Sequence, residues 1–518
     1  MKGTQFRDET LGGIGYWVKR QAELSPLRPA LADLDQSLTW GELNSRVNQL
    51  AHALLARGIA HGDRVAGLLW NGIPFLEAIF ATAKLGAILV PINFRLSEPE
   101  VRYILSDSGA RLLLCHDSFY PIAEAVMNGD NVIRVADPGT SRTHSPYESL
   151  LAAFPDTEPQ SEVKTHDIHV MMYTSGTTGK PKGAQLSHRN ATWNAIQLML
   201  HEATLRVDDT VLTVAPLFHI GGLGVHTLPA MYLGAFVIVL SRFNPQEVLE
   251  TIQNRHITAL FLVPAMWLAL SQVPDFDHYD LSSLRVLVSG GAPCPIPLIE
   301  FYQSRGLTFL EGFGMTETAP ITMILGSVDA IRKHGSIGRP LFYQGARVVD
   351  ESDQDVGTDE VGELVLQGPN IFEGYWNMPQ ATQDAFRGSW FHTGDLARVD
   401  PEGFFYLVDR KKDLLISGGE NVYPVEVEQV LVRHPNIVEA AVIGVPDLTW
   451  GEVPLAVLVL KDASQSLRIE DIQQFCQGRL AGFKIPKAVR VAASLPRNAT
   501  GKVLKTMLRQ IYAKEGDA

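Results

Sequence analysis

The sequence predicts an α/β protein with a large N-terminal domain, built of several subdomains in which mixed and parallel sheets are layered with helices, and a small α+β domain at the C-terminal end. Three observations point to this class. Short apolar runs rich in β-branched residues alternate with amphipathic segments, which is the rhythm of βαβ units. The 44 Gly and 30 Pro are spread along the chain, as many strand-turn-helix junctions require. Near residue 410 a basic, polar stretch interrupts this rhythm.

The predicted strands follow one another at the spacing of parallel units. Apolar runs predict strands at 64–69, 112–115, 170–173, 235–240, 259–263 and 284–289. Helical patterns follow several of them, over 74–85 and 245–256 for example. Because each strand is followed within a few residues by a helix candidate, parallel sheets covered by helices are expected.

The domain boundary is predicted near residue 409. The charged stretch from Asp409 to Asp413 leads into the polar, glycine-containing stretch from Ser417 to Pro424. The residues after this point read as a small α/β unit of their own. We therefore predict an N-terminal domain over 1–409 and a C-terminal domain over 410–518.

Charge and composition exclude several classes. Lys and Arg number 44 and Asp and Glu 57, so the net charge is −13 and the sequence pI is about 5.6. A protein that neutralises nucleic-acid phosphates needs a basic face, so no nucleic acid is expected as a partner. Hydrophobic residues make up 46% and charged residues 19%, which is typical of a globular protein rather than a disordered one.

Cysteine usage and hydropathy predict a soluble cytoplasmic protein. The three cysteines, Cys115, Cys294 and Cys476, are odd in number and far apart, which argues against a disulfide framework or a CxxC metal site. The longest apolar stretch, 258–270, is too short for a membrane span and contains Pro264. No transmembrane segment is expected, although peripheral contact with a membrane stays compatible with the sequence.

A phosphate-binding loop is predicted directly after the strand at 170–173. The run Tyr-Thr-Ser-Gly-Thr-Thr-Gly-Lys-Pro-Lys-Gly at 173–183 combines glycines, which let backbone amides approach phosphate oxygens, with hydroxyl donors and two lysines. It is not a Walker loop, because Thr174 and Pro181 stand where that motif needs Gly and Ser or Thr. The alternative is an ordinary surface turn. The candidate residues are Thr174, Ser175, Gly176, Thr177, Thr178, Gly179, Lys180 and Lys182.

Further motifs follow this loop in a fixed order. They are Pro216–His219, Ser289–Pro293, Glu311–Glu317, Trp390–Asp395, Asp409–Asp413, Ser417–Pro424 and Pro496–Lys502. In this series the chain resembles the AMP-forming acyl-CoA synthetases, within the larger group that includes luciferases and the adenylation domains of peptide synthetases. The resemblance implies a small C-terminal lid that rotates about a hinge near Lys412. It also implies a reaction through an acyl-adenylate that uses ATP, Mg²⁺ and coenzyme A.

The resemblance implies that most of these motifs contact the nucleotide. Phe313 offers an aromatic face to adenine, although members of the family commonly have Tyr there; stacking survives that change. Thr316 offers a phosphate donor, and Glu317 with Thr177 offers oxygen ligands for Mg²⁺. The implied ATP contacts beyond the phosphate loop are Gly291, Ala292, Pro293, Glu311, Gly312, Phe313, Gly314, Met315, Thr316, Asp395, Arg410 and Lys502.

Four residues are expected to act in catalysis: Lys502, Thr316, Glu317 and His219. Lys502 would bridge the substrate carboxylate and the α-phosphate, or else be a solvated lysine near the terminus. His219 would orient the carboxylate or gate its channel, or else be a buried core histidine. Asp395 would accept the ribose hydroxyls or serve only as a turn residue, and Arg410 beside it would be a ribose contact or part of a solvated charged face.

The coenzyme A and acyl sites rest on the resemblance and on side-chain size. Gly418 and Gly419 would let the pantetheine arm pass close to the backbone, and Glu420, Asn421 and Lys505 would meet its polar groups. The acyl pocket is expected from His219, Gly222, Val263, Gly291, Gly314, Met315 and Thr322, which are mostly apolar or small. No general base for the thiol step stands out in the sequence.

These assignments predict an acid-thiol ligase that joins a carboxylic acid to coenzyme A and releases AMP and pyrophosphate. A medium- or long-chain fatty acid is the favoured substrate, which would place the enzyme in fatty acid metabolism. The alternative is an aryl acid of the feruloyl or coumaroyl type. A third hypothesis is a scaffold that keeps the fold without activity. The sequence leaves the oligomeric state open, with a dimer among the options.

Overall fold

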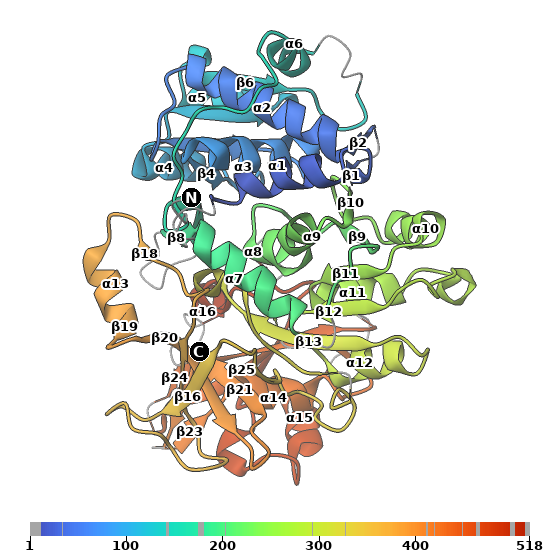
Figure 1. Cartoon of the computed structure of the whole chain (residues 1–518). Helices are drawn as coiled ribbons and strands as arrows, with labels where there is room; N and C mark the ends of the chain where they lie inside the picture. The colour runs from blue at the N-terminus through green and yellow to red at the C-terminus, as the bar shows by residue number, and fades with distance from the viewer. Residues whose placement is uncertain are drawn as a thin grey trace. The chain divides into compact units, whose positions relative to one another are not determined.

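The chain forms two compact units, which we describe separately. The structure, a computed structural model, describes residues 12–33, 35–140, 145–174, 181–201, 204–292, 294–326, 328–410, 413–418, 420–447, 449–462, 467–497 and 503–512. The first unit contains residues up to 334 with 340–345 and 367–389, and the second contains 335–339, 346–366 and 390 onward. Figure 1 shows the elements of both units coloured along the chain.

One sheet of the first unit has the strand order β18-β8-β7-β4-β3-β5-β6. Its strands are β3 (Arg64–Leu68), β4 (Ile88–Pro91), β5 (Leu112–His116), β6 (Val132–Val135), β7 (Ile168–Thr174), β8 (Lys182–Ser187) and β18 (Gly374–Tyr375). The pairs from β7 to β6 are parallel, whereas β8 is antiparallel to both β7 and β18. The last two strands therefore form a hairpin and an edge strand beside a parallel core.

Helices cover this sheet. They are α1 (Gly15–Leu24), α2 (Trp40–Ala56), α3 (Ile73–Leu85), α4 (Glu98–Ser108), α5 (Tyr120–Val126) and α6 (Pro146–Ala152). Helices α1, α2 and α3 contact one another, and α3 also contacts β3, β4 and β7 (Figure 1). All the side chains of α3 are buried, which is expected of a helix that is apolar on every side and lies between a sheet and other helices.

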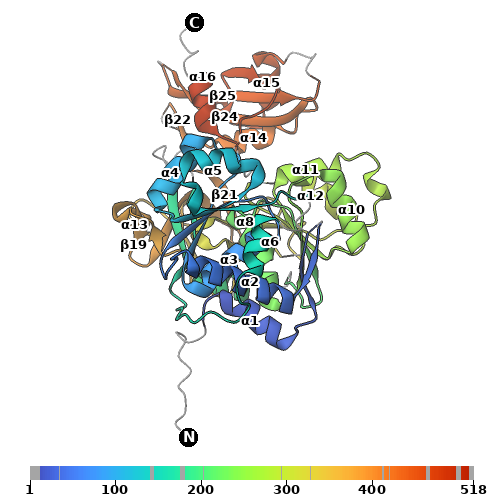
Figure 2. The same cartoon turned by 90° about the horizontal axis from the view of Figure 1, so that it is seen from above.

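The second sheet of this unit follows the order β14-β13-β12-β11-β9-β10-β1-β2. Its strands are β1 (Pro29–Ala32), β2 (Ser37–Thr39), β9 (Thr210–Thr213), β10 (Phe236–Val239), β11 (Ala259–Leu262), β12 (Val286–Ser289), β13 (Phe309–Gly314) and β14 (Ile321–Ile324). Helices α10 (Pro245–Arg255), α11 (Pro264–Ser271) and α12 (Ile296–Gln303) lie together beside it (Figure 2) and share one apolar core with its strands.

The remaining elements of the first unit lie on connections between the strands. They are α7 (His188–Met199), α8 (Ile220–Gly222), the π-helical turn η4 (Leu223–Thr227), α9 (Leu228–Leu233), α13 (Pro379–Ala385) and β19 (Phe386–Arg387). Helices α7 and α9 contact each other and α9 contacts α1. The short strand β15 (Arg339–Pro340) stands where the chain passes from one unit to the other.

The second unit contains two small sheets. Strands β16 (Gly345–Val349), β17 (Gly362–Gln367), β20 (Trp390–Val399) and β21 (Phe405–Arg410) form the first, and β22 (Leu415–Ser417), β23 (Glu420–Val422), β24 (Ile437–Asp447), β25 (Gly451–Leu460) and β26 (Ala488–Val491) form the second. Helices α14 (Pro424–Leu431) and α15 (Ile469–Cys476) share an apolar core with the second sheet, and α16 (Lys505–Tyr512) contributes to another.

The predicted fold class is confirmed, with a large mixed α/β unit and a smaller one. Each predicted strand is present within a few residues of its expected ends, and the helix expected over 74–85 is α3. Strand β20 and most of β21, which lie before residue 410, belong to the smaller unit. A hinge near Lys412 stays a prediction, since Lys412 lies outside the described residues.

Two predictions about cysteines and membrane spans can be compared with the structure. Cys115, Cys294 and Cys476 are buried and form no disulfide. Within the described part of the chain, every helix is too short or too polar to cross a membrane.

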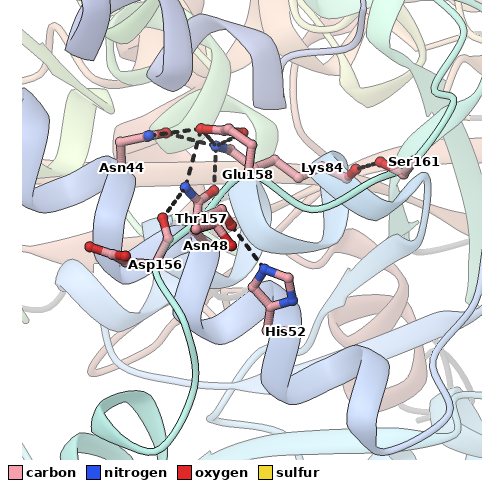
Figure 3. Close-up of polar contacts among 8 residues, drawn as sticks. All are labelled: Asn44, Asn48, His52, Lys84, Asp156, Thr157, Glu158 and Ser161. Carbon is pink, nitrogen blue, oxygen red and sulfur yellow. Dashed lines mark hydrogen bonds and ion pairs between the residues drawn. The ribbon is translucent and has the colours of Figure 1, made fainter.

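A strap of irregular chain over residues 153–167 joins α6 to β7 and is held by side chains. Figure 3 shows the buried ammonium of Lys84, on α3, donating to Asn44 at 2.7 Å, Asn48 at 2.6 Å and the Glu158 carboxylate at 2.7 Å. Asn48 in turn donates to the carbonyl of Asp156 at 2.7 Å. The strap forms no strand or helix of its own that could satisfy its polar groups, so the bonds to the Glu158 carboxylate and the Asp156 carbonyl satisfy these two instead.

Candidate active site

The predicted phosphate loop connects the two strands of the β7–β8 hairpin. Thr174 ends β7 and pairs in register with Lys182, the first residue of β8. The hairpin therefore fixes both ends of the loop. The predicted contacts Ser175, Gly176, Thr177, Thr178, Gly179 and Lys180 lie outside the described residues.

Lys182 and Glu317 are joined through an aromatic residue that sequence reasoning missed. The ammonium of Lys182 lies 4.9 Å from the centre of the Tyr375 ring, within the range of a cation–π contact. The hydroxyl of Tyr375 donates to the Glu317 carboxylate at 2.8 Å. Tyr375 occupies this position because β18 pairs with β8, with Tyr375 opposite Ala184. The structure thus brings a loop lysine and the candidate metal carboxylate to one place.

Glu317 lies in a short 3₁₀ turn, Thr316–Thr318, between β13 and β14. The side chain of Asn370, fully buried, donates to the carbonyls of Thr318 at 2.7 Å and Ile321 at 3.1 Å. A Cβ at Gly314 would lie 1.8 Å from the Pro320 carbonyl oxygen, so only glycine fits there. Backbone contacts on both sides therefore set the position of the nearly buried Glu317 side chain.

The loop after β12 and the end of β13, which are predicted to form an adenine wall, lie side by side. Ser289 and Glu311 pair in register on these parallel strands, and a Cβ at Gly290 would lie 3.0 Å from the Gly312 carbonyl oxygen. Phe313 follows on β13 and is largely buried. Gly291 and Ala292 lie in the turn after β12, whereas Pro293 lies outside the described residues. The predicted nucleotide residues of this wall are thus neighbours.

His219 is held neutral beside the expected acyl pocket. Burial, together with the charge of Arg95, lowers the pKa of His219 to about 4. Asn71, at the end of β3, fixes the preceding loop by accepting from the amide of Leu217 at 2.9 Å and donating to the Ala215 carbonyl at 3.1 Å. A neutral imidazole can orient a carboxylate as a hydrogen-bond donor but contributes no charge.

The predicted acyl-pocket residues come from four segments of the chain, and the segment that continues to Gly224 contacts the one that contains Pro320 and Ile321. A Cβ at Gly224 would lie 2.4 Å from Cδ of Pro320. Asn194, on α7, donates to the Gly224 carbonyl at 2.8 Å and accepts from the Ile321 amide at 3.1 Å. This buried amide bracket sets the spacing between the two loops.

The other pocket positions lie close to these loops. A Cβ at Gly291 would lie 3.5 Å from a methyl of Val263, and the Thr322 hydroxyl donates to the Phe313 carbonyl at 3.2 Å. Gly222 approaches the carbonyls of Ala215 and Pro216 so closely that a side chain has no room. Met315 directly precedes the turn that contains Glu317. That these residues line an acyl pocket stays a prediction.

In the second unit, Asp395 and Arg410 form an ion pair. They face each other in register on β20 and β21, and the Arg410 guanidinium contacts the Asp395 carboxylate. The Asp395 amide also donates to the Thr393 hydroxyl at 3.0 Å. The two residues predicted to read the ribose are therefore partners of each other, and the carboxylate is almost fully buried.

The predicted pantetheine residues lie on the tight β22–β23 hairpin. Gly418 has a φ of 61°, and a Cβ there would lie 2.5 Å from the ring of Trp450. Its amide donates to the Trp450 carbonyl at 2.8 Å. Glu420 and Asn421 are exposed, and Trp450 is half exposed. Gly419 lies outside the described residues.

Of the two lysines predicted to act in the second unit, Lys505 lies among the described residues and Lys502 does not. Lys505 is largely buried and pairs with Glu428 at 2.8 Å. Burial opposes its charge, but Glu428 and Asp409 outweigh that effect and raise the pKa of Lys505. Its ammonium is thus engaged inside the unit, which gives the coenzyme A role little support. Lys502 lies outside the described residues.

The described residues contain no cluster of three or more His, Cys, Asp or Glu side chains that could hold a metal ion. Mg²⁺ does not need such a cluster, because it keeps several waters and is commonly bound by one or two carboxylates together with substrate phosphates. The buried Glu317 carboxylate, linked through Tyr375 to Lys182, fits that mode of binding.

Several residues that shape the site escaped sequence reasoning. Asn71, Asn194 and Asn370 are buried amides that join loops far apart in the chain. Strand pairing brings Tyr375 to the phosphate-loop hairpin of the large unit and, separately, Trp450 to the Gly418 hairpin of the small unit. A signal was present for Tyr375, since it lies in the Gly-Tyr-Trp run at 374–376 shortly after a Pro-Asn pair. The asparagines carry no local pattern.

Known proteins match the chain over almost its whole length. Residues 18–376 match the family model of the AMP-binding enzyme, and residues 426–502 match that of the AMP-binding enzyme C-terminal domain. Feruloyl-CoA synthase of an Amycolatopsis species is 42% identical over 500 residues, covering 96% of this chain and 99% of that protein. Long-chain-fatty-acid CoA ligase FadD13 of Mycobacterium tuberculosis is 38% identical over 506 residues, covering 96% and 98%.

A solved structure agrees with these sequence matches. The o-succinylbenzoate coenzyme A synthetase MenE of Bacillus subtilis, in complex with ATP and a magnesium ion, has a TM-score of 0.84 and 34% identity, covering 95% of this chain and 99% of that chain. The fold, the order of the motifs and both family models therefore agree, and the chain belongs to the AMP-binding enzyme family.

Proposed function

We propose that this protein is an ATP-dependent ligase that joins an apolar carboxylic acid to coenzyme A. The observation that carries the proposal is the contact of Lys182 with Tyr375 and of Tyr375 with Glu317 beside the phosphate-loop hairpin. A lysine, a hydroxyl donor and a metal-type carboxylate in one place suit the polyphosphate of ATP. The relatives named above, a feruloyl-CoA synthase and a fatty-acid CoA ligase, support the same reaction class.

The first half-reaction asks little proton chemistry of the protein. The substrate carboxylate is already ionised at neutral pH. Its oxygen attacks the α-phosphorus of ATP, the bond to pyrophosphate breaks, and an acyl-adenylate remains. Lys182 and the loop hydroxyls would hold the phosphates, and Mg²⁺ bound at Glu317 would neutralise charge on them. Alignment and charge stabilisation account for most of the catalysis in such transfers.

The second half-reaction transfers the acyl group to sulfur. The coenzyme A thiol first loses its proton to solvent. The resulting thiolate attacks the acyl carbon, the bond from that carbon to the AMP oxygen breaks, and the thioester and AMP leave. Gly418 would border the path of the pantetheine arm, because it has no side chain and adjoins the half-exposed Trp450. The exposed Glu420 and Asn421 offer polar groups on the same hairpin.

The roles of the remaining predicted residues follow from their partners. Asp395 would accept the ribose hydroxyls while its ion pair with Arg410 keeps the carboxylate ionised. His219, held neutral, would donate to the substrate carboxylate or gate its channel. Lys502 would supply the cation that meets the developing charge between carboxylate and α-phosphate.

The substrate is an apolar acid, and two classes are in contention. The predicted acyl-pocket residues Val263, Met315 and Thr322 carry no charge that could pair with a charged distal group, and an unpaired buried charge is costly. A fatty acid fits such a pocket. An aryl acid is the second candidate, favoured by the 42% identity to a feruloyl-CoA synthase.

Pyrophosphate release tests the activity and the substrate class together. The purified protein, ATP, Mg²⁺ and coenzyme A are assayed for kcat/KM with octanoate, palmitate, cinnamate and ferulate. We expect one of the two pairs to exceed the other by at least about tenfold, since about 1.4 kcal/mol of pocket complementarity is enough for that ratio. Absence of pyrophosphate release with every acid would favour the scaffold hypothesis.

A further inference from the structure

Strand β20 bulges away from β17 at the residues that lead to Asp395. Between two paired positions of these antiparallel strands, β17 has the single residue Leu364, whereas β20 has Thr393, Gly394 and Asp395. Gly394 has a φ of 70°, in the left-handed region that favours glycine. The extra residues of a bulge lose their ladder bonds, and bulges near functional sites aim a side chain in a particular direction. The side chain on this bulge is that of Asp395.

Side chains replace the ladder bonds within the bulge. One oxygen of the Glu363 carboxylate accepts from the Gly394 amide at 3.2 Å. The Thr393 hydroxyl donates to the Leu364 carbonyl at 2.7 Å and accepts from the Asp395 amide at 3.0 Å. On the side that faces β17, the backbone that carries Asp395 is therefore held by the side chains of Glu363 and Thr393.

The Glu363 carboxylate is itself restricted. Glu363 is only 9% exposed, and its second oxygen lies 3.3 Å from Nδ1 of His392. The His392 side chain is also buried, and its Nε2 atom lies 3.7 Å from the Asp353 carboxylate. Turning the Glu363 carboxylate would leave the Gly394 amide without its acceptor, which is costly for a group that water cannot reach freely. Glu363 therefore keeps one arrangement and imposes it on the bulge.

We propose that Glu363 is a positioning residue for nucleotide recognition: it holds the bulge of β20 through the Gly394 amide, and the bulge fixes the Asp395 carboxylate where it meets the ribose hydroxyls. The inference rests on the ribose role proposed above for Asp395. Glu363 acts through the backbone, so the length of its side chain and its acceptor oxygen are what matter. The phosphates and the adenine are expected to contact the large unit, so a disturbed bulge should affect recognition of the ribose alone.

The experiment measures how strongly the protein distinguishes AMP from an AMP analogue that lacks both ribose hydroxyls. Calorimetry gives Kd for each ligand, and the ratio of the analogue's Kd to that of AMP reports ribose recognition. For wild type we expect a ratio of roughly 10 to 100, since hydrogen bonds to a charged group are strong. Asp395→Ala removes the carboxylate and should bring the ratio below about 3. Glu363→Leu should do the same, while its Kd for the analogue changes by less than about threefold.

Two conservative variants separate the reach of the Glu363 side chain from its charge. Glu363→Asp keeps the carboxylate but is one methylene group shorter, so it should lower the ratio toward that of Asp395→Ala. Glu363→Gln keeps the length and an acceptor oxygen for the Gly394 amide, so it should restore most of the ratio lost in Glu363→Leu. Both variants stay close to Glu in size and decide the question even if Glu363→Leu does not fold. A ratio kept by Asp and lost by Gln contradicts the proposal.

Glu360→Leu is the matched control. The exposed Glu360 accepts from the Gly357 amide at 2.9 Å in another turn of the same unit, and its loss should leave the ratio within about twofold of wild type. An unchanged ratio in both Glu363→Leu and Glu363→Asp overturns the proposal, and so does an equal loss of affinity for AMP and the analogue, because a merely structural residue would act in that way.

The same measurements distinguish failure of this inference from failure of the proposed function. If wild type does not bind AMP, the nucleotide function is contradicted and the inference with it. If wild type binds AMP but its ratio is already near one, the ribose role of Asp395 and the role of Glu363 are both contradicted, while the ligase activity is not.

Discussion

The candidate groups of the two units are positioned in different ways. In the large unit, Lys182 and Glu317 are held by Tyr375, and the loops around them are bracketed by the buried amides of Asn194 and Asn370. In the small unit, the candidate groups are set by strand register. Asp395 faces Arg410, and the Gly418 amide bonds to the carbonyl of Trp450.

This difference suggests a division of tasks. Buried side-chain brackets lose stability when one partner is removed, because the other is left unsatisfied. Such brackets keep the segments around Gly224, Thr318 and Ile321 of the large unit in one arrangement. A strand pair and an exposed hairpin constrain the neighbouring side chains less than buried brackets do. A small unit built in this way can change its surface contacts without losing its apolar core. We expect variants in the large unit to affect both half-reactions and variants in the small unit to affect one.

The largest effect is expected for Lys502→Ala, which tests whether the small unit supplies a decisive group to only one half-reaction. A positioned cation acting on phosphoryl charge can be worth about 10³- to 10⁵-fold in rate. Adenylation should fall by that range, while conversion of a supplied acyl-adenylate to thioester stays close to wild type. Single-turnover assays of each half-reaction measure this. Lys487→Ala, an exposed lysine of the same unit, should change both rates by less than about threefold, and equal losses for Lys502→Ala in both halves would reject its role.

The next largest effect is expected for Glu317→Gln, in the large unit. Loss of the carboxylate charge removes a proposed Mg²⁺ ligand, so adenylation should fall by roughly 10²- to 10³-fold and the Mg²⁺ concentration for half-maximal rate should rise. Tyr375→Phe keeps the carboxylate and removes only its donor, so its effect should be about tenfold or less. A rate and Mg²⁺ dependence that do not change in Glu317→Gln would remove this residue from the metal site.

Gly418→Leu should impair thioester formation and spare adenylation, which is the opposite of the pattern expected for Lys502→Ala. A side chain there meets the Trp450 ring and would fill the proposed pantetheine path. Thioester formation from supplied acyl-adenylate should fall by about 10- to 100-fold, the scale on which a small misplacement reduces rates, and adenylation should change by less than about threefold. Trp450→Ala combined with Gly418→Ala distinguishes the causes: recovery of the thioester rate relative to Gly418→Ala alone would assign the loss to the clash with Trp450.

The smallest effect is expected for Asn194→Leu, which tests the brackets of the large unit. Removing the amide leaves the Gly224 carbonyl and the Ile321 amide without their buried partner, so the free energy of unfolding should fall by about 1 to 3 kcal/mol. Denaturant titration measures this. The kcat/KM for the preferred acid should fall by several fold more than that for ATP. A loss shared equally between acid and ATP would show that Asn194 serves stability alone.

The sequence predicts the elements better than the contacts between them. Strands such as 259–263 were predictable because their signal, a run of apolar and β-branched residues, is local. The register of Asp395 against Arg410 was not, since it depends on the pairing of β20 with β21. Asn194 and Trp450 were missed for the same reason. Their partners lie far away in the chain, and an isolated Asn or Trp looks like any other.

The strap over residues 153–167 lacks secondary structure, yet we expect it to tolerate insertions poorly. Irregular surface segments are the usual places where insertions, tags and domain fusions are accepted. Here the Asn48 amide binds the Asp156 carbonyl and the Lys84 ammonium binds the Glu158 carboxylate, which ties the strap to α2 and α3. An added residue near Glu158 would move these partners out of register and leave a buried ammonium unmatched. For protein engineering, this loop is therefore as intolerant of changes in length as a central strand.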